Sequence, residues 1–154
     1  MRTPAALLFA LIGTLGAANQ VHLSPRFQTV YIVPMANSLD QHLASRLTSS
    51  RVLWVVLQPP AADVVLTDAL DDEFWTWLDR NYPLPAAAAS GYRGPSYPAG
   101  YSPPKRRGTI FLVDPRTRVV LWSIYELPKD SSPASLDRSA WRITNQLRIA
   151  FGRK

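Results

Sequence analysis

The sequence predicts an α/β domain in which helices pack on a single mixed β-sheet of about five strands. Short runs rich in β-branched and aromatic residues alternate with segments whose apolar residues recur every three or four positions. Their order along the chain is β-α-β-β-(α, loose loop)-β-β-α. Mixed order with few strands indicates one sheet with helices packed against it, and we place this single domain at residues 29–151.

The domain begins with a predicted strand at residues 29–33, which Pro34 ends because proline offers no N–H to a sheet. The next segment predicts a helix that starts with a capping box made by Ser38 and Gln41 and ends at residues 49–50. One apolar stripe runs along this helix at intervals of four residues: Leu39, Leu43 and Leu47.

Two strands are predicted next. Residues 52–57, VLWVVL, form a continuous apolar run, which is typical of a strand covered on both faces. Residues 63–67 predict a third, short strand. We expect Trp54 of the first run to share a common hydrophobic interior with Phe111 and Leu147.

A helix is predicted from Asp71 to Arg80, because Asp71, Asp72 and Glu73 occupy its first turn, where the helix dipole favours negative charge. Its apolar face consists of Phe74, Trp77 and Leu78. Residues 83–104 contain six prolines and three glycines without apolar periodicity. Such a composition cannot offset chain entropy by burial, so we interpret it as a loose Pro/Gly-rich insertion.

The stretch GTIFLVDPRTRVVLWSIY predicts a hairpin of two strands, at 110–113 and 119–125. Asp114 and Pro115 between them are the residues that the first and second positions of a type I turn prefer. Asp114 is therefore interpreted as a turn residue rather than a catalytic group. The last helix starts at Ser132 or Ser135, and its apolar stripe follows the 3.6-residue period: Leu136, Ala140, Ile143, Leu147 and Phe151.

The amino terminus has the pattern of a secretory signal peptide at residues 1–18. Arg2 precedes the apolar stretch 4–15, and small residues at 16–18 predict cleavage after Ala18. The apolar stretch is shorter than the roughly 20 residues that span a membrane, so no transmembrane segment is expected after signal removal. We therefore expect a periplasmic or secreted protein.

The composition excludes several function classes. The chain contains no cysteine, which rules out thiol catalysis, disulfides, cysteine zinc sites and lipid attachment at a cysteine. It has no glycine-rich phosphate loop, and its only histidines, His22 and His42, lack the sequence context of a catalytic triad. The sequence thus predicts no catalytic residue, no cofactor and no metal site.

Charge is distributed unevenly along the chain, which carries +6 overall. Residues 19–90 carry a net −3, whereas residues 91–154 carry +8. A basic half indicates an acidic partner or an anionic polymer, and export disfavours nucleic acid. The candidate partner surface consists of Arg93, Lys105, Arg106, Arg107, Arg138 and Arg142.

Four stretches carry a resemblance to a known group. "TVYIVPMANS", "LDQHLASRLTSSRVLWVV", "AADVVLTDAL" and "GTIFLVDPRTRVVLWS" resemble the strands, first helix and penultimate hairpin of TolB amino-terminal-like α/β domains, a group that includes the CsgG- and LpoB-type modules of bacterial envelopes. The resemblance implies a module that works by protein contact. An uncharacterised exported bacterial family of the same architecture is the alternative.

The expected function is therefore a non-enzymatic binding or assembly module of the cell envelope, whose partner is another envelope protein. One alternative is a binder of anionic envelope polymers through the basic segment 93–107. A second is a carbohydrate-active hydrolase that uses the acidic and aromatic segment 68–82. There Asp68, Asp71, Asp72 and Glu73 offer a carboxylate pair or oxygen ligands for Ca²⁺ or Mg²⁺. The aromatic residues that could stack on sugars are Phe74, Trp75, Trp77 and Tyr82.

Overall fold

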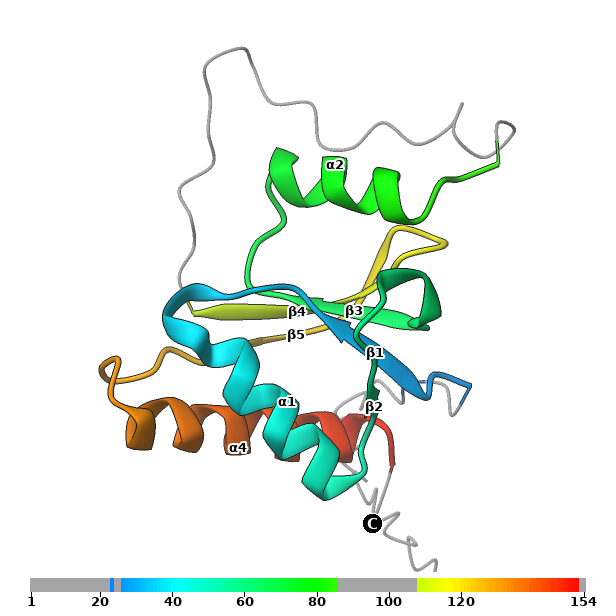
Figure 1. Cartoon of the computed structure of the whole chain (residues 1–154). Helices are drawn as coiled ribbons and strands as arrows, with labels where there is room; N and C mark the ends of the chain where they lie inside the picture. Colours follow the sequence, from blue (N-terminus) through cyan, green and yellow to red (C-terminus); the bar gives the residue numbers. More distant parts are fainter. Residues whose placement is uncertain (1–22, 24–25, 86–107, 153–154) are drawn as a thin grey trace, which may run out of the picture.

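The computed structural model describes residue 23 and the ranges 26–85 and 108–152 (Figure 1). Five strands form one sheet: β1 (Thr29–Ile32), β2 (Trp54–Val55), β3 (Val64–Thr67), β4 (Thr109–Asp114) and β5 (Val119–Tyr125). Within the described residues, three α-helices accompany them: α1 (Leu39–Ser50), α2 (Asp72–Asn81) and α4 (Pro133–Ala150). The predicted fold class and element order are confirmed. The predicted signal peptide, most of the insertion 83–104 and the basic residues between 93 and 107 lie outside the described residues.

The strands are arranged in the order β2-β1-β3-β4-β5. β1 runs parallel to both of its neighbours, and the register of one pair places Val30 opposite Val64. β4 is antiparallel to β3 and to β5. The sheet is therefore parallel on the β1 side and antiparallel on the hairpin side.

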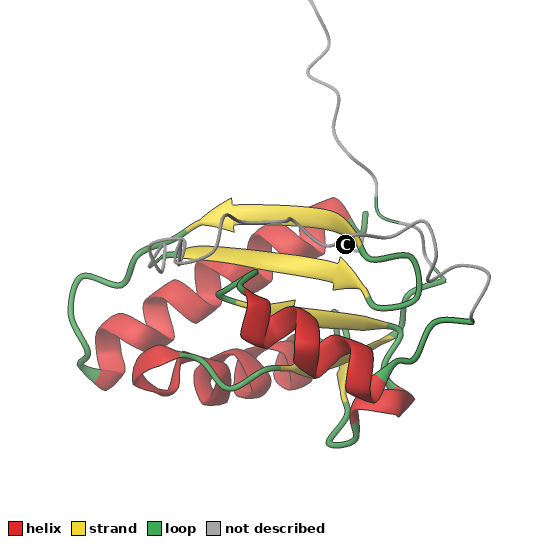
Figure 2. Ribbon diagram, turned by 90° about the horizontal axis from the view of Figure 1, so that it is seen from above, coloured by secondary structure: helices red, strands yellow, loops and turns green. Residues whose placement is uncertain are grey.

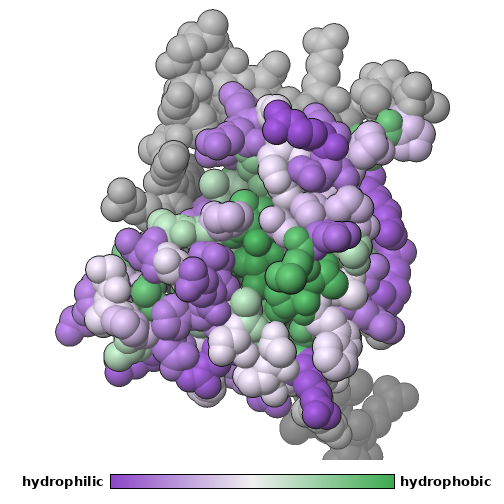
Figure 3. All heavy atoms as spheres, in the orientation of Figure 1, coloured by the Kyte–Doolittle hydropathy of each residue, from purple (hydrophilic) through white to green (hydrophobic). Residues whose placement is uncertain are grey.

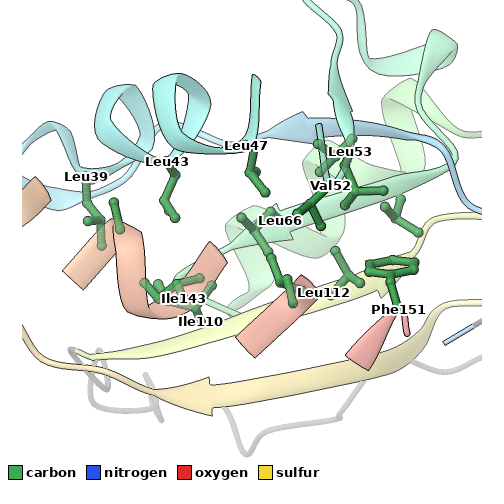
Figure 4. Packing of buried hydrophobic residues seen from close by; sticks show 14 of the residues in the cluster. Leu39, Leu43, Leu47, Val52, Leu53, Leu66, Ile110, Leu112, Ile143 and Phe151 are labelled. Carbon is green, nitrogen blue, oxygen red and sulfur yellow. The ribbon is translucent and has the colours of Figure 1, made fainter. Parts of the chain in front are cut away.

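The helices cover the sheet from two sides (Figures 1 and 2). α1 and α4 pack side by side on one face, and α2 lies on the opposite face. The larger core lies beneath α1 and α4, where Leu43, Leu47 and Ile143 are fully buried against Leu66 and Leu112 (Figure 4). A smaller cluster beneath α2 is built from Val65, Phe74, Leu78, Tyr82 and Val113.

The strand predicted at 52–57 differs from the structure. β2 comprises two residues at the edge of the sheet, and only the preceding Val52 and Leu53 are buried. Trp54 is 58% exposed and Leu57 is 91% exposed, so the expectation that Trp54 lies in the interior was wrong. The strand covered on both faces is β3, all of whose residues are buried, because strand pairing places it between β1 and β4.

Leu147 was also expected in the interior, and it is fully buried on the inner face of α4. Phe111 is only partly buried, in the separate cluster beneath α2. Successive residues of a strand point to opposite faces, and β4 therefore sends Phe111 away from the larger core. The predicted single interior is in fact two clusters divided by the sheet.

Helix starts agree with the sequence prediction in two cases of three. Asp71 caps α2 by accepting a hydrogen bond from the Phe74 amide at 2.9 Å, and Ser132 caps α4. The capping box at Ser38 is wrong: Ser38 has left-handed backbone angles (φ 63°) and makes no side-chain cap. A short 3₁₀ turn, Ala36–Ser38, leads into α1 instead.

The hairpin prediction is confirmed. Asp114 Oδ1 accepts hydrogen bonds from the backbone amides of Arg116 (2.9 Å) and Thr117 (3.3 Å), which orders the turn. The amide of Arg118 donates to the carbonyl of Asp114 at 2.9 Å, and Arg118 closes the loop with a left-handed φ of 61°. Asp114 therefore has a structural role.

The carboxylate of Asp63 ties the start of β1 to β3, and we expect it to make stability depend on pH. It accepts hydrogen bonds from the Gln28 and Thr29 amides and from the Thr29 hydroxyl. Burial alone would raise the pKa of Asp63, but these hydrogen bonds and the charge of Arg116 lower it below its ordinary value. The stabilisation is present above the unfolded pKa of about 4 and is lost as pH falls through the lower folded pKa.

An Asp63→Asn variant should therefore lose less stability than the wild type between pH 7 and pH 2.5 in urea titrations. Asp72→Asn is the matched control, since Asp72 is exposed, and it should keep the wild-type acid sensitivity. Asp130 and Asp137 also have lowered pKa values and titrate in all three proteins. An unchanged acid slope in Asp63→Asn would contradict the assignment.

Candidate functional site

A cavity of about 630 Å³ opens where β1 and β3 end. The chain leaves β1 through α1 on one face of the sheet and leaves β3 through α2 on the other, toward opposite sides. Adjacent parallel strands whose connections diverge in this way leave a crevice at their carboxyl ends, where α/β proteins commonly bind ligands. The site is thus the switch-point cavity of the sheet.

One wall of the switch-point cavity is aromatic. The ring of Tyr31, on β1, stacks on that of Trp77, on α2, with 5.4 Å between centroids and an interplanar angle of 21°. Phe74, one helical turn before Trp77, lies 6.2 Å from the same indole ring. Alternation along β1 points Tyr31 toward α2, and helical spacing puts Phe74 and Trp77 on the face that packs on the sheet.

The other wall is acidic. Asp68, Asp71 and Glu73 line the cavity, and no basic residue of the described chain does. Asp68 Oδ2 accepts the amide of Ala36 at 3.3 Å, and Asp71 is the helix cap. Glu73 is exposed and makes no ion pair with any described residue. The cavity therefore combines a flat apolar surface with uncompensated negative charge.

The far end of α2 is anchored by Tyr82. Its hydroxyl donates to the carbonyl of Pro59, and its ring lies 6.3 Å from that of Trp77. Burial, followed by the neighbouring Tyr31, raises the pKa of Tyr82 to about 12. The hydroxyl therefore remains a donor at neutral pH and fixes the helix that carries Glu73.

Sequence reasoning found part of this site. The predicted acidic and aromatic segment 68–82 does contribute to the cavity, but Asp72, Trp75 and Tyr82 are not among its lining residues. The contribution of Tyr31 and of the turn after β1, at 33–36, was missed. The only available signal was the position of Tyr31 near the end of a strand. Within the part of the chain that the structure describes, no cluster of acidic and histidine side chains could hold a metal ion.

The predicted basic surface is only partly described. Arg93, Lys105, Arg106 and Arg107 lie outside the described residues. Arg138 is exposed on α4. Arg142 Nη1 donates to Glu126 at 3.0 Å, so part of its charge is already compensated. The structure does not bring these residues together into a described patch, and none of the described helices is long and apolar enough to cross a membrane.

Comparison with known proteins identifies no relative from which a function could be inferred. No family model matches the chain, and no curated protein or solved structure matches it significantly. The functional interpretation therefore depends on the switch-point cavity itself. The cavity has an aromatic wall and three carboxylates, and it lies at the ends of two parallel strands.

Proposed function

We propose that this chain is a non-enzymatic binding module of the bacterial envelope and that it recognises a cationic side chain of a partner protein in the switch-point cavity. One observation carries the proposal: the stacked Tyr31 and Trp77 rings share a cavity with three carboxylates. Carboxylates attract an ammonium or guanidinium group, and an aromatic face stabilises the same cation. A lysine or arginine side chain fits both walls.

Three features support this proposal. Asp68 and Asp71 already accept backbone hydrogen bonds, which fixes the orientation of their side chains in the cavity wall. The apolar patch seen in Figure 3 around β1 and β2 offers further area for a protein partner. The signal peptide expected at 1–18 and the resemblance to TolB amino-terminal-like domains support an envelope location.

The cavity can be tested with acetyl-arginine amide, acetyl-lysine amide and the neutral acetyl-glutamine amide as probes. We expect the two cationic probes to shift the Trp77 indole NMR signal and the neutral probe to leave it unchanged. Glu73→Gln removes one exposed carboxylate and should weaken cation binding about 2- to 5-fold, the range of a partly screened charge interaction. Asp72→Asn is the matched control, since Asp72 belongs to the same helical turn but does not line the cavity.

Equal binding of the neutral probe, or equal loss in Asp72→Asn and Glu73→Gln, would overturn the proposal. The same two variants serve in capture experiments with envelope extract. A partner that the wild type and Asp72→Asn retain, and that Glu73→Gln releases, would then be identified by mass spectrometry.

A carbohydrate-active hydrolase is the second candidate, favoured by the presence of Asp71 and Glu73 beside Trp77 in one cavity. A glycosidase needs two carboxyl groups around the scissile bond, and an aromatic ring can support the sugar. The wild type would then release nitrophenol from a panel of nitrophenyl glycosides, and Glu73→Gln would not. Absence of turnover above the buffer rate across the panel would remove this candidate. Anionic polymer binding through 93–107 stays a prediction, because that segment lies outside the described residues.

A further inference from the structure

A second groove is lined by residues of α1 and α4. These two helices lie on the opposite face of the sheet from α2 (Figures 1 and 2). This helix groove has a volume of about 320 Å³. α1 contributes Arg46 and two serines to its lining, and α4 contributes Trp141, Thr144, Asn145 and Arg148. The groove therefore carries two arginines and three hydroxyl side chains, of which only Thr144 is buried.

Thr144 is the most informative residue of the helix groove. It is 5% exposed, and its Oγ1 is buried with no hydrogen-bond partner. A threonine inside a helix usually donates to the carbonyl of the preceding turn, and a buried hydroxyl without any partner is destabilising. Thr144 lines the groove, and no described residue of the chain forms a hydrogen bond with its hydroxyl.

Arg148 adds a positive charge that lacks an acidic partner. Its Nη2 donates to Asn145 Oδ1 at 2.8 Å, a neutral acceptor, and it forms no ion pair with any described residue. The Asn145 amide nitrogen is a second donor beside this contact. Asn145 is adjacent to Thr144 in α4, and Arg148 follows Thr144 by one helical turn. The donors of Asn145 and Arg148 therefore lie close to Thr144.

Arg46 approaches from α1. Its Nε donates to Asp137 Oδ1 at 2.8 Å, and its Nη2 donates to the other oxygen of the same carboxylate. The hydrogen bond from Arg46 lowers the pKa of Asp137, which keeps the carboxylate ionised and the guanidinium oriented. The charges of Arg46 and Asp137 cancel, and Arg148 adds one positive charge to the groove.

Trp141 supplies the apolar part of the groove. It is 53% exposed, although it lies next to the packed helix interface. A half-exposed indole beside arginines offers a flat surface on which a ring can stack while its charged substituent reaches the donors. Phosphate has three terminal oxygens and a charge between −1.5 and −2 at neutral pH, so it matches two guanidinium groups, a hydroxyl and an amide better than a carboxylate does.

We propose that the helix groove binds a phosphate monoester carried on a sugar ring, with the phosphate on Arg148, Arg46 and Thr144 and the ring against Trp141. This site is separate from the switch-point cavity, because α1 and α4 cover the other face of the sheet. The two sites can therefore succeed or fail independently.

The probes are glucose 6-phosphate, inorganic phosphate and glucose, followed by amide NMR shifts of the full chain. Glucose 6-phosphate should bind with a Kd on the order of 1 mM or tighter and shift residues around 141–148. Inorganic phosphate alone should bind several-fold more weakly, and glucose alone should not bind. Equal affinity for inorganic phosphate would refute the role of Trp141, and no shift at 141–148 up to about 10 mM of the phosphosugar would refute the site.

Three variants assign the contacts. Arg148→Gln should weaken binding about tenfold, the usual effect of losing a charge-assisted hydrogen bond. Thr144→Val keeps the shape but removes the hydroxyl, so it should weaken binding several-fold while its thermal stability stays at or above that of the wild type. Arg138→Gln removes an exposed arginine of the same helix outside the groove and should leave binding unchanged. An equal loss in Arg138→Gln would mean that only net charge matters and would overturn the proposal.

Discussion

Replacing Leu66 with alanine is expected to lower the free energy of unfolding by about 2–5 kcal/mol, the usual cost of a large-to-small change in a packed core. Leu66 is fully buried on β3, the central strand, where it packs in the cluster beneath α1 and α4 together with Leu112 and Val52 (Figure 4). Single domains are stable by only about 5–15 kcal/mol, so this one change should remove a large part of the total.

Urea titration followed by circular dichroism measures the loss. Leu57→Ala is the matched control, because the same side chain is lost at a position that is 91% exposed. Its free energy of unfolding should change by no more than about 0.5 kcal/mol. If both variants lost the same stability, the assignment of β3 to the doubly covered centre of the sheet would be contradicted.

Asp79→Asn should destabilise the protein by about 1–3 kcal/mol, although Asp79 itself is largely exposed. Its Oδ1 accepts from Nη2 of Arg118 at 2.7 Å, and the same nitrogen donates to the carbonyl of Tyr82 at 2.7 Å. The Arg118 side chain is 1% exposed, and its Nε and Nη1 are buried without partners. Asp79→Asn would leave the buried guanidinium without the negative charge that compensates it, which is costly.

Arg118→Met is the informative comparison. It removes the buried charge and the two partnerless donors while it keeps an unbranched side chain of similar length. Replacement of a buried charge by an apolar group is often close to neutral, so Arg118→Met should destabilise less than Asp79→Asn. A larger loss in Arg118→Met than in Asp79→Asn would mean that the geometry of the guanidinium, rather than its charge, holds the hairpin to α2.

The same contact bears on the candidate site. Arg118 belongs to the turn between β4 and β5, whereas Asp79 and Tyr82 belong to the end of α2. The tie therefore fixes the helix whose first turns carry Asp71, Glu73 and Trp77. Loss of Asp79 should weaken cation binding in the switch-point cavity as well as stability, and the binding measured at low temperature separates the two effects.

Features that depend on neighbouring residues could be read from the sequence. The apolar period of residues 136–151 predicted α4 and its buried stripe. The acidic cluster with Asp71 at its start predicted the beginning of α2, and the Asp114-Pro115 pair predicted the hairpin. In each case the hydrogen bonds join residues within four positions of one another, so local chemistry is sufficient.

Tertiary structure alone decided where these elements lie. The apolar run at 52–57 has the composition of a central strand, yet β2 lies at the sheet edge and β3 occupies the centre. The cavity joins Tyr31 to Trp77, and the helix groove joins Arg46 to Arg148. Neither pair has a signature in the sequence, because strand order and side-chain convergence depend on which faces are buried together across the whole chain.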